Sequence, residues 1–78
     1  MKKAVSRPID VINLKTGRIV RELREKSGMT QKDFGILLEI DASSISRIEN
    51  GRQGLLISDL FTLTRHFKLS FEHFLGEE

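Results

Sequence analysis

Apolar residues recur at helical spacing in two short segments between residues 30 and 51, and a tight break separates the segments. In the first segment, Phe34 and Leu38 lie four residues apart on one face, which predicts a helix with a buried side. Thr30 comes just before this segment and can cap it, with Asp33 completing a capping box. The helix is therefore expected to begin directly after Thr30.

The second segment is expected to be a helix around residues 42–50, with Asp41 as its N-cap and Gly51 as its C-terminal stop. Ile45 and Ile48 lie on one side of this helix and should be buried. The other side carries small polar and basic residues: Ser43, Ser46, Arg47 and Asn50. Because serine favours caps over helix interiors, this composition makes a poor isolated helix. It does suit the presentation of short hydroxyl groups to base edges and phosphates.

The remaining sequence predicts three more helices, which gives an all-α fold of five helices. The first is expected from about Leu14 to Ser27, with Val20 on its buried side. The fourth covers about residues 57–67, and a short fifth helix follows Ser70. The helical domain is therefore expected over residues 14–76.

Residues 1–13 are expected to be an N-terminal tail or docking segment. Residues 1–7 are basic and show no periodicity, so they are interpreted as a flexible tail, with a DNA-contacting arm as the alternative. Within residues 8–14, the side chains of Ile9, Val11 and Ile12 are apolar. This stretch either docks on the domain as an extended segment or lengthens the first helix, and the sequence leaves both alternatives open.

The composition is that of one small domain with few candidate ligands for a cofactor. The chain has 78 residues and no cysteine, which excludes disulfides and thiolate metal sites. Glu72 is adjacent in the sequence to His73, which lies seven residues after the other histidine, His66. No further metal ligand or nucleophile lies at a workable spacing from them. No apolar run approaches the roughly 18 residues of a membrane span. We therefore expect a cytoplasmic, non-enzymatic protein without cofactor, metal or membrane contact.

Charge is distributed unevenly along the chain, although the net charge is only +2. Residues 1–28 hold eight Lys or Arg and three Asp or Glu, a net charge of +5, whereas residues 58–78 have a net charge of −2. A basic N-terminal third beside an acidic C-terminal third predicts a polarised molecule with one side facing phosphates.

A larger set of positions resembles the helix-turn-helix pattern of the Xre/Cro/lambda-repressor family. The centre of the match is Arg24, Gly28, Thr30, Gln31, Phe34, Ile45, Ser46, Glu49 and Gly51. Positions in the same register extend it over residues 14–75: Gly17, Val20, Leu60, Leu63, Phe67, Leu69 and Leu75. The resemblance implies a lambda-repressor-like DNA-binding domain in which helices 2 and 3 form the helix-turn-helix. It also implies a transcriptional regulator, which we expect to be a repressor.

Two positions depart from the family pattern, which usually has Ala and Gly where this chain has Gly35 and Glu39. Gly35 preserves a close contact between helices but weakens its helix by about 1 kcal/mol relative to Ala. Glu39 is expected to be strained in a left-handed turn, at a cost on the order of 1 kcal/mol.

The resemblance also implies roles for individual residues. Contacts with bases in the major groove are expected from Ala42, Ser43, Ser46 and Arg47. Arg47 is the candidate for a bidentate contact with guanine, which contributes about 1 to 3 kcal/mol of discrimination. Phosphate contacts are expected from Gln31, Asn50 and Arg52. Arg24 and Glu49 are expected to form a structural ion pair between the first helix and the end of the recognition helix.

An apolar set near the C-terminus favours self-association: Leu55, Leu56, Phe71 and Phe74. The alternative is that these side chains complete the core. Helix-turn-helix proteins gain affinity by placing two recognition helices one DNA turn apart, about 34 Å. We therefore expect a homodimer that binds a palindromic site on double-stranded DNA.

The sequence does not distinguish this role from two other roles of the same fold. The chain is alternatively the antitoxin component of a toxin–antitoxin pair, or a restriction-modification control protein. Ile36, Leu37 and Ile40 make the end of the first motif helix unusually apolar, which favours a surface for a protein partner such as a toxin or another regulator.

Overall fold

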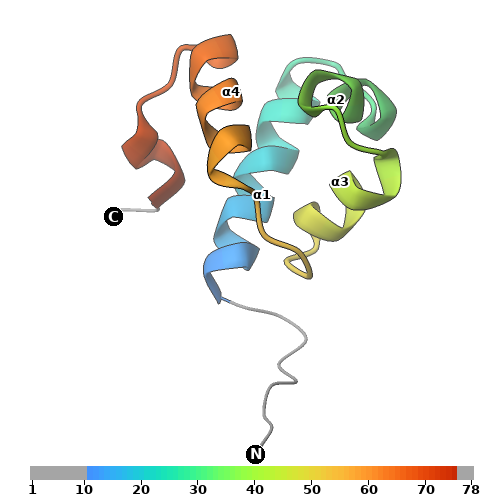
Figure 1. Ribbon diagram of the computed structural model, residues 1–78, viewed down its shortest axis with the longest axis horizontal. Coiled ribbons are helices and arrows are strands. Elements are labelled where there is room, and N and C mark those ends of the chain that lie inside the picture. Colours follow the sequence, from blue (N-terminus) through green and yellow to red (C-terminus); the bar gives the residue numbers. More distant parts are fainter. Residues whose placement is uncertain (1–10, 76–78) are drawn as a thin grey trace, which may run out of the picture.

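The computed structural model describes residues 11–75, which form four α-helices and one short 3-10 helix (Figure 1). In chain order these are α1 (Val11–Lys26), α2 (Gln31–Leu38), α3 (Ala42–Glu49), α4 (Ile57–Phe67) and η1 (Phe71–Leu75). Figure 1 shows α1 in the middle, with α2 and α3 on one side and α4 and η1 on the other. The predicted all-helical fold is confirmed. No helix within residues 11–75 is long and apolar enough to cross a membrane.

The predicted fifth α-helix is instead η1, so the expectation of five α-helices is not confirmed. The segment spans five residues, fewer than two turns, and the amide of His73 donates to the carbonyl of Ser70 at 3.1 Å. That i to i+3 bond is typical of 3-10 geometry, which is common in segments too short for an α-helical ladder.

The N-terminal ends of α2 and α3 are capped as the sequence predicts. Thr30 Oγ1 accepts from the Asp33 amide at 3.0 Å, and the Thr30 amide donates to the Asp33 carboxylate at 3.0 Å. At the start of α3, the Asp41 carboxylate accepts from the Ser44 amide at 3.2 Å. These bonds satisfy amides that have no partner inside the helix, which explains why each helix begins there.

The first helix begins earlier than residue 14, because residues 11–13 form the first turn of α1. Of the two alternatives for this stretch, lengthening of the first helix therefore holds for residues 11–13. Residues 1–10 and 76–78 lie outside the described residues, and the expected tail and its alternative, a DNA-contacting arm, lie within the first of these segments.

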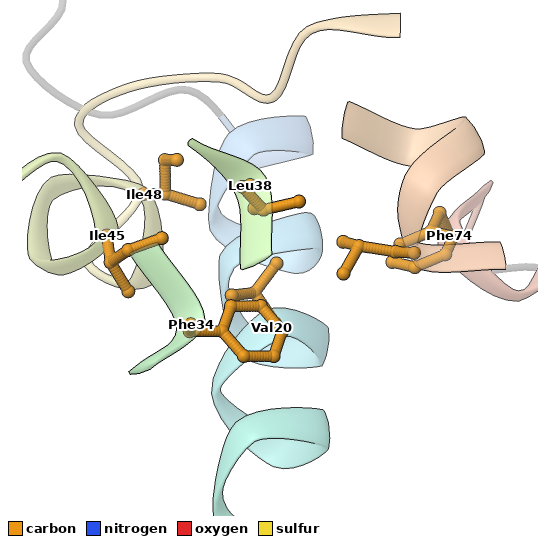
Figure 2. Packing of buried hydrophobic residues seen from close by; sticks show 7 residues of the cluster. Val20, Phe34, Leu38, Ile45, Ile48 and Phe74 are labelled. Atoms are coloured by element: carbon orange, nitrogen blue, oxygen red, sulfur yellow. The ribbon is translucent and has the colours of Figure 1, made fainter. Parts of the chain in front are cut away.

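The core is a single apolar cluster to which every helical segment contributes (Figure 2). Its fully or almost fully buried members are Val20, Phe34, Leu38, Ile45, Ile48, Leu63 and Phe74. Phe74, which was expected in a surface patch, is only 3% exposed. The reason is that η1 packs against both α1 and α4, so Phe74 completes the core from the side opposite α2 and α3.

Close packing of α1 on α3 depends on a residue without a side chain. A Cβ atom on Gly17 would lie 2.1 Å from the carbonyl oxygen of Ile48, far inside van der Waals contact. Gly17 therefore lets the backbones of the two helices approach, and this contact fixes where α3 lies on the domain.

Candidate nucleic-acid interface

The turn between α2 and α3 has the left-handed conformation expected at Glu39, with φ 63° and ψ 40°. The amide of Ile40 donates to the carbonyl of Gly35 at 2.8 Å, and that of Glu39 donates to Ile36 at 3.2 Å, which closes a Schellman motif. A Cβ atom on Gly35 would lie 2.5 Å from the Ile40 carbonyl oxygen. Glycine at position 35 thus leaves room for the Ile40 carbonyl, and a side chain there would require the turn into α3 to shift.

A buried ion pair fixes the end of α3 against α1. Arg24 Nε donates to Glu49 Oε2 at 2.6 Å and Arg24 Nη2 donates to Glu49 Oε1 at 3.2 Å, so the predicted pair is present and bidentate. Arg24 Nη1 also donates to the carbonyl of Met29 at 3.0 Å. The hydrogen bond with Glu49 raises the pKa of the Arg24 guanidinium above its ordinary value. The side chain of Glu49 is fully buried, so the pair is desolvated and geometrically fixed.

Two further side chains contact the same carboxylate, and the sequence analysis did not assign them to it. Gln31 Nε2 donates to Glu49 Oε1 at 3.1 Å, and Arg21 Nε lies 3.6 Å from the same oxygen. Arg21 lies one turn before Arg24 on α1, and this i, i+3 spacing was the available signal. Glu49 therefore joins α1, the start of α2 and the end of α3.

The side of α3 opposite the core carries the polar residues predicted for it. Ser43, Arg47 and Asn50 are exposed, and Ala42 and Ser46 are half-buried. The structure thus brings the four predicted base-contacting residues, Ala42, Ser43, Ser46 and Arg47, together on one short helix.

Arg47 is held at two points on this surface. Its Nε donates to Gln53 Oε1 at 2.9 Å, and its Nη2 donates to Ser44 Oγ at 3.0 Å. Neither Gln53 nor Ser44 was among the predicted site residues. Ser44 lies three residues before Arg47, a spacing visible in the sequence, whereas the approach of Gln53 depends on the loop after α3.

The three predicted phosphate-contacting residues differ in their surroundings. Gln31 is half-buried at the first position of α2, where it donates to Glu49. Asn50 is exposed just after α3, and its Nδ2 donates to the carbonyl of Ser46 at 2.8 Å. Arg52 is exposed in the following loop. Only Gln31 lies at a helix N-terminus, where a phosphate would meet free backbone N–H groups, whereas Asn50 and Arg52 follow the C-terminal end of α3 and offer their side chains.

Four exposed apolar side chains lie on α4, at its N-cap and on η1, and we call them the α4 patch: Leu56, Ile57, Phe61 and Phe71. Their exposed fractions are 66%, 62%, 56% and 40%. The rings of Phe61 and Phe71 stack with centroids 6.0 Å apart. Leu55, which was expected in this patch, is half-buried and packs against the core.

Ile57 and Phe61 were not among the predicted patch residues. Their i, i+4 spacing places them on a common helix face, away from the inward-facing Leu63, and was the signal available.

The second predicted protein-binding surface is smaller than expected. Leu37 and Ile40 pack against the core, and only Ile36 is strongly exposed, at 69%. Among residues 11–75, no group of three His, Cys, Asp or Glu side chains is arranged to hold a metal ion.

Two short helices joined by a tight turn, with the second fixed by its apolar side and polar on the other, define a helix-turn-helix DNA-binding unit. A profile of the family described as Helix-turn-helix domain matches residues 16–72. The chain belongs to this family, and it is a DNA-binding domain similar to those of transcriptional regulators.

A curated relative is the HTH-type transcriptional regulator PrpR of Mycobacterium tuberculosis. It is 30% identical over 62 residues, which are 80% of this chain but only 13% of PrpR. The likeness to PrpR therefore concerns the helix-turn-helix part alone.

Solved structures share the fold over most of their length. The restriction-modification controller protein C.Esp1396I has a TM-score of 0.67 and 26% identity, with 85% of this chain and 86% of that chain covered. C.AhdI, a restriction-modification controller protein from Aeromonas hydrophila, has a TM-score of 0.67 and 22% identity, with 80% and 90% covered. The clp gene regulator ClgR from C. glutamicum has a TM-score of 0.70 and 18% identity, with 85% and 86% covered. The last two similarities concern the fold alone.

Proposed function

We propose that this chain acts as a sequence-specific transcriptional repressor that inserts α3 into the major groove of double-stranded DNA. The observation that carries the proposal is the division of α3 into a buried side, with Ile45 and Ile48, and an exposed side with Ser43 and Arg47. A helix fixed from one side presents the other in a constant orientation, as contact with base edges requires.

The roles of single residues follow from this orientation. Arg47 donates to guanine, Ala42 contacts a thymine methyl group, and the hydroxyl groups of Ser43 and Ser46 bond to base edges. Gln31, Asn50 and Arg52 contact phosphates on either side of the groove and fix the register of α3. Because only one of the base-contacting side chains is long, much of the specificity comes from DNA shape.

The proposal includes a homodimer formed through the α4 patch. Four neighbouring apolar side chains, each at least 40% exposed, are more than scattered surface residues and support an interface. Dimers of helix-turn-helix proteins place two recognition helices on successive major grooves, about 34 Å apart, and the patch is the surface that we propose for this pairing. Phe61→Ser is expected to give monomers in analytical ultracentrifugation, whereas a wild-type chain that is monomeric with and without DNA would remove the dimer.

A second candidate is a control function for a restriction-modification system, which the similarity to C.Esp1396I supports. It uses the same DNA-binding domain and differs in the genes regulated. An antitoxin role is the third candidate, for which the exposed Ile36 would be one contact with a toxin.

The test is selection of duplexes from a random pool with the wild-type chain and with Arg47→Ala. We expect an enriched palindrome in which preference for one guanine falls by about 1 to 3 kcal/mol in the variant. The salt dependence checks phosphate contact, since log K should fall by about 0.9 per neutralised phosphate for each log unit of salt. The absence of any enriched sequence would reject sequence-specific binding by this chain alone.

A further inference from the structure

The two contacts of Arg47 come from different segments of the chain. Ser44 is on α3 itself, whereas Gln53 lies beyond the helix end, in the loop that leads to α4. Gln53 thus reaches back across the end of α3 to the side chain proposed to contact guanine.

The loop that carries Gln53 has a defined course. The amide of Arg52 donates to the carbonyl of Arg47 at 2.9 Å, and the amide of Gly51 donates to Ile48 at 3.1 Å, so the chain turns sharply after α3. Directly after Gln53, a Cβ atom on Gly54 would lie 3.0 Å from Asn13 Oδ1, so the loop passes close to the first turn of α1. Gln53 itself is half-buried. The side-chain oxygen Oε1 of Gln53 is therefore held in place by a loop whose backbone has a defined conformation.

We infer that Gln53 is a positioning residue, which orients the Arg47 guanidinium for its contact with a base. This inference rests on the proposed function. A guanidinium has five N–H donors. Arg47 donates its Nε–H to Gln53 and one of its two Nη2 hydrogens to Ser44. Both Nη1 donors and one Nη2 donor remain, which suffices for two bonds to a guanine. Gln53 thus occupies the part of the group that a guanine does not need.

The expected consequence is selectivity more than affinity. An unrestrained arginine loses rotamer freedom when it meets a base, and it can also bond to a neighbouring base or phosphate. The hydrogen bond from Arg47 Nε to Gln53 removes part of this freedom before DNA is bound, and it restricts the remaining donors of Arg47 to one direction. From the usual cost of fixing one long side chain, removing Gln53 should lower the guanine preference by about three- to tenfold.

Two other roles of Gln53 predict different results. If Gln53 contacts DNA directly, its loss weakens binding even when Arg47 is absent. If Gln53 instead holds Arg47 away from the groove, its loss strengthens the guanine preference. The experiment must therefore combine substitutions at both positions.

The experiment uses the duplex that the wild-type chain enriches and its single-base variants at the position that Arg47→Ala relaxes. Gln53→Met keeps the length of the side chain and removes the acceptor, so the guanine preference should fall about three- to tenfold. In the Arg47→Ala background, Gln53→Met should change nothing. Gln53→Glu keeps an acceptor for Arg47 Nε and should retain the preference, with weaker binding to all duplexes from phosphate repulsion. Arg52→Met is the matched loop control, which should weaken binding equally for all bases.

A measurement without DNA separates this inference from the proposed function. In the free wild-type chain, the NMR signal of Arg47 Nε–H should exchange slowly with water, and Gln53→Met should accelerate that exchange. Unchanged exchange and unchanged guanine preference in folded Gln53→Met would overturn the positioning role, as would a strengthened preference or an equal effect in the Arg47→Ala background. If Arg47→Ala itself leaves base preference unaltered, the proposed function fails at Arg47, and the inference about Gln53 fails with it.

Discussion

Arg24 and Arg47 each donate hydrogen bonds to two residues, but Arg24 does so inside the helix-turn-helix unit and Arg47 does so on its surface. The Arg24 side chain is 14% exposed and faces a carboxylate that is fully buried. Arg47 is exposed, and its partners are the neutral side chains of Gln53 and Ser44. We call these the interior side and the exposed side of the unit.

The difference between the two sides explains how α3 can be stably folded while the residues on its exposed side remain free to vary. Three serines in an eight-residue helix give it little helical preference of its own, so its conformation depends on the interior side. The exposed side then contributes little to folding, and its residues can be chosen for DNA. Substitutions on the two sides should therefore affect different quantities: the free energy of unfolding on one, and base preference on the other.

The largest effect is expected from Arg24→Met, which leaves Glu49 buried with only Gln31 and Arg21 close to it. Breaking one side of a fully buried ion pair costs about 3 to 5 kcal/mol of unfolding free energy. Because Arg21 Nε stays 3.6 Å from the Glu49 carboxylate and retains part of the compensation, the loss should lie at the lower end, about 3 kcal/mol. Urea denaturation followed by circular dichroism measures this loss.

Arg47→Met is the matched control on the exposed side. It removes the same kind of side chain but leaves no buried charge, so unfolding should change by no more than about 0.5 kcal/mol. Equal losses in the two variants would break the distinction between the two sides.

A smaller loss is expected from Gly35→Ala on the interior side, although alanine is the better helix former. The added Cβ would lie 2.5 Å from the Ile40 carbonyl oxygen, which belongs to the backbone of the turn and cannot simply rotate away. Overpacking of this kind typically costs about 1 to 3 kcal/mol. The gain in helix propensity, about 1 kcal/mol, offsets only part of it.

The check for Gly35→Ala is thermal unfolding, with Ser27→Ala after α1 as a control that adds no buried atom. A higher melting temperature in Gly35→Ala would show that the turn can shift at little cost. It would also mean that the direction in which the turn leads the chain into α3 is less restricted than the structure shows.

Much of the interior side could be predicted because it depends on local patterns. The caps at Thr30 and Asp41 follow from residue type and spacing, whereas the left-handed turn at Glu39 was implied by the family resemblance, and the structure contains all three. The pairing of Arg24 with Glu49 came from the family resemblance, since no local rule links residues 25 positions apart.

What the sequence did not reveal depends on how distant segments meet. Phe74 was placed in a candidate dimer patch with completion of the core as the alternative, and the alternative holds, although nothing local shows that η1 folds back onto α1. The contact of Gln53 with Arg47 was missed for the same reason, since it needs the course of a loop. The α4 patch was found only in part, because α4 is apolar on two faces and a single-face periodicity does not separate them.

A stabilising effect of less than about 1 kcal/mol is expected from Glu39→Gly in the turn. A side chain in the left-handed region costs roughly 1 to 2 kcal/mol, and the greater freedom of glycine in the unfolded chain cancels part of the gain. Lys68→Gly, at the left-handed end of α4, is the matched variant outside the helix-turn-helix unit. Denaturation midpoints should rise in both, and a fall in Glu39→Gly alone would show that this side chain stabilises the turn in another way.

The smallest effect concerns the pH dependence of the cap on α3. Hydrogen bonds from Ser44 and Ser43 lower the pKa of the Asp41 carboxyl below its ordinary value. A carboxyl with a lowered folded pKa contributes stability above its unfolded pKa, about 3.9, and that contribution is lost as pH falls through the folded value. Asp41→Asn keeps a capping oxygen but does not titrate.

In urea unfolding from neutral to acid pH, wild type should therefore lose slightly more stability than Asp41→Asn below about pH 4. The titration of Asp33, whose pKa is also lowered, by its bonds with Thr30, is common to both proteins and cancels in the difference. Parallel stability curves would mean that the charged Asp41 cap adds nothing beyond what a neutral amide provides. In that case the cap would stabilise α3 through its hydrogen bond to the Ser44 amide and not through its charge.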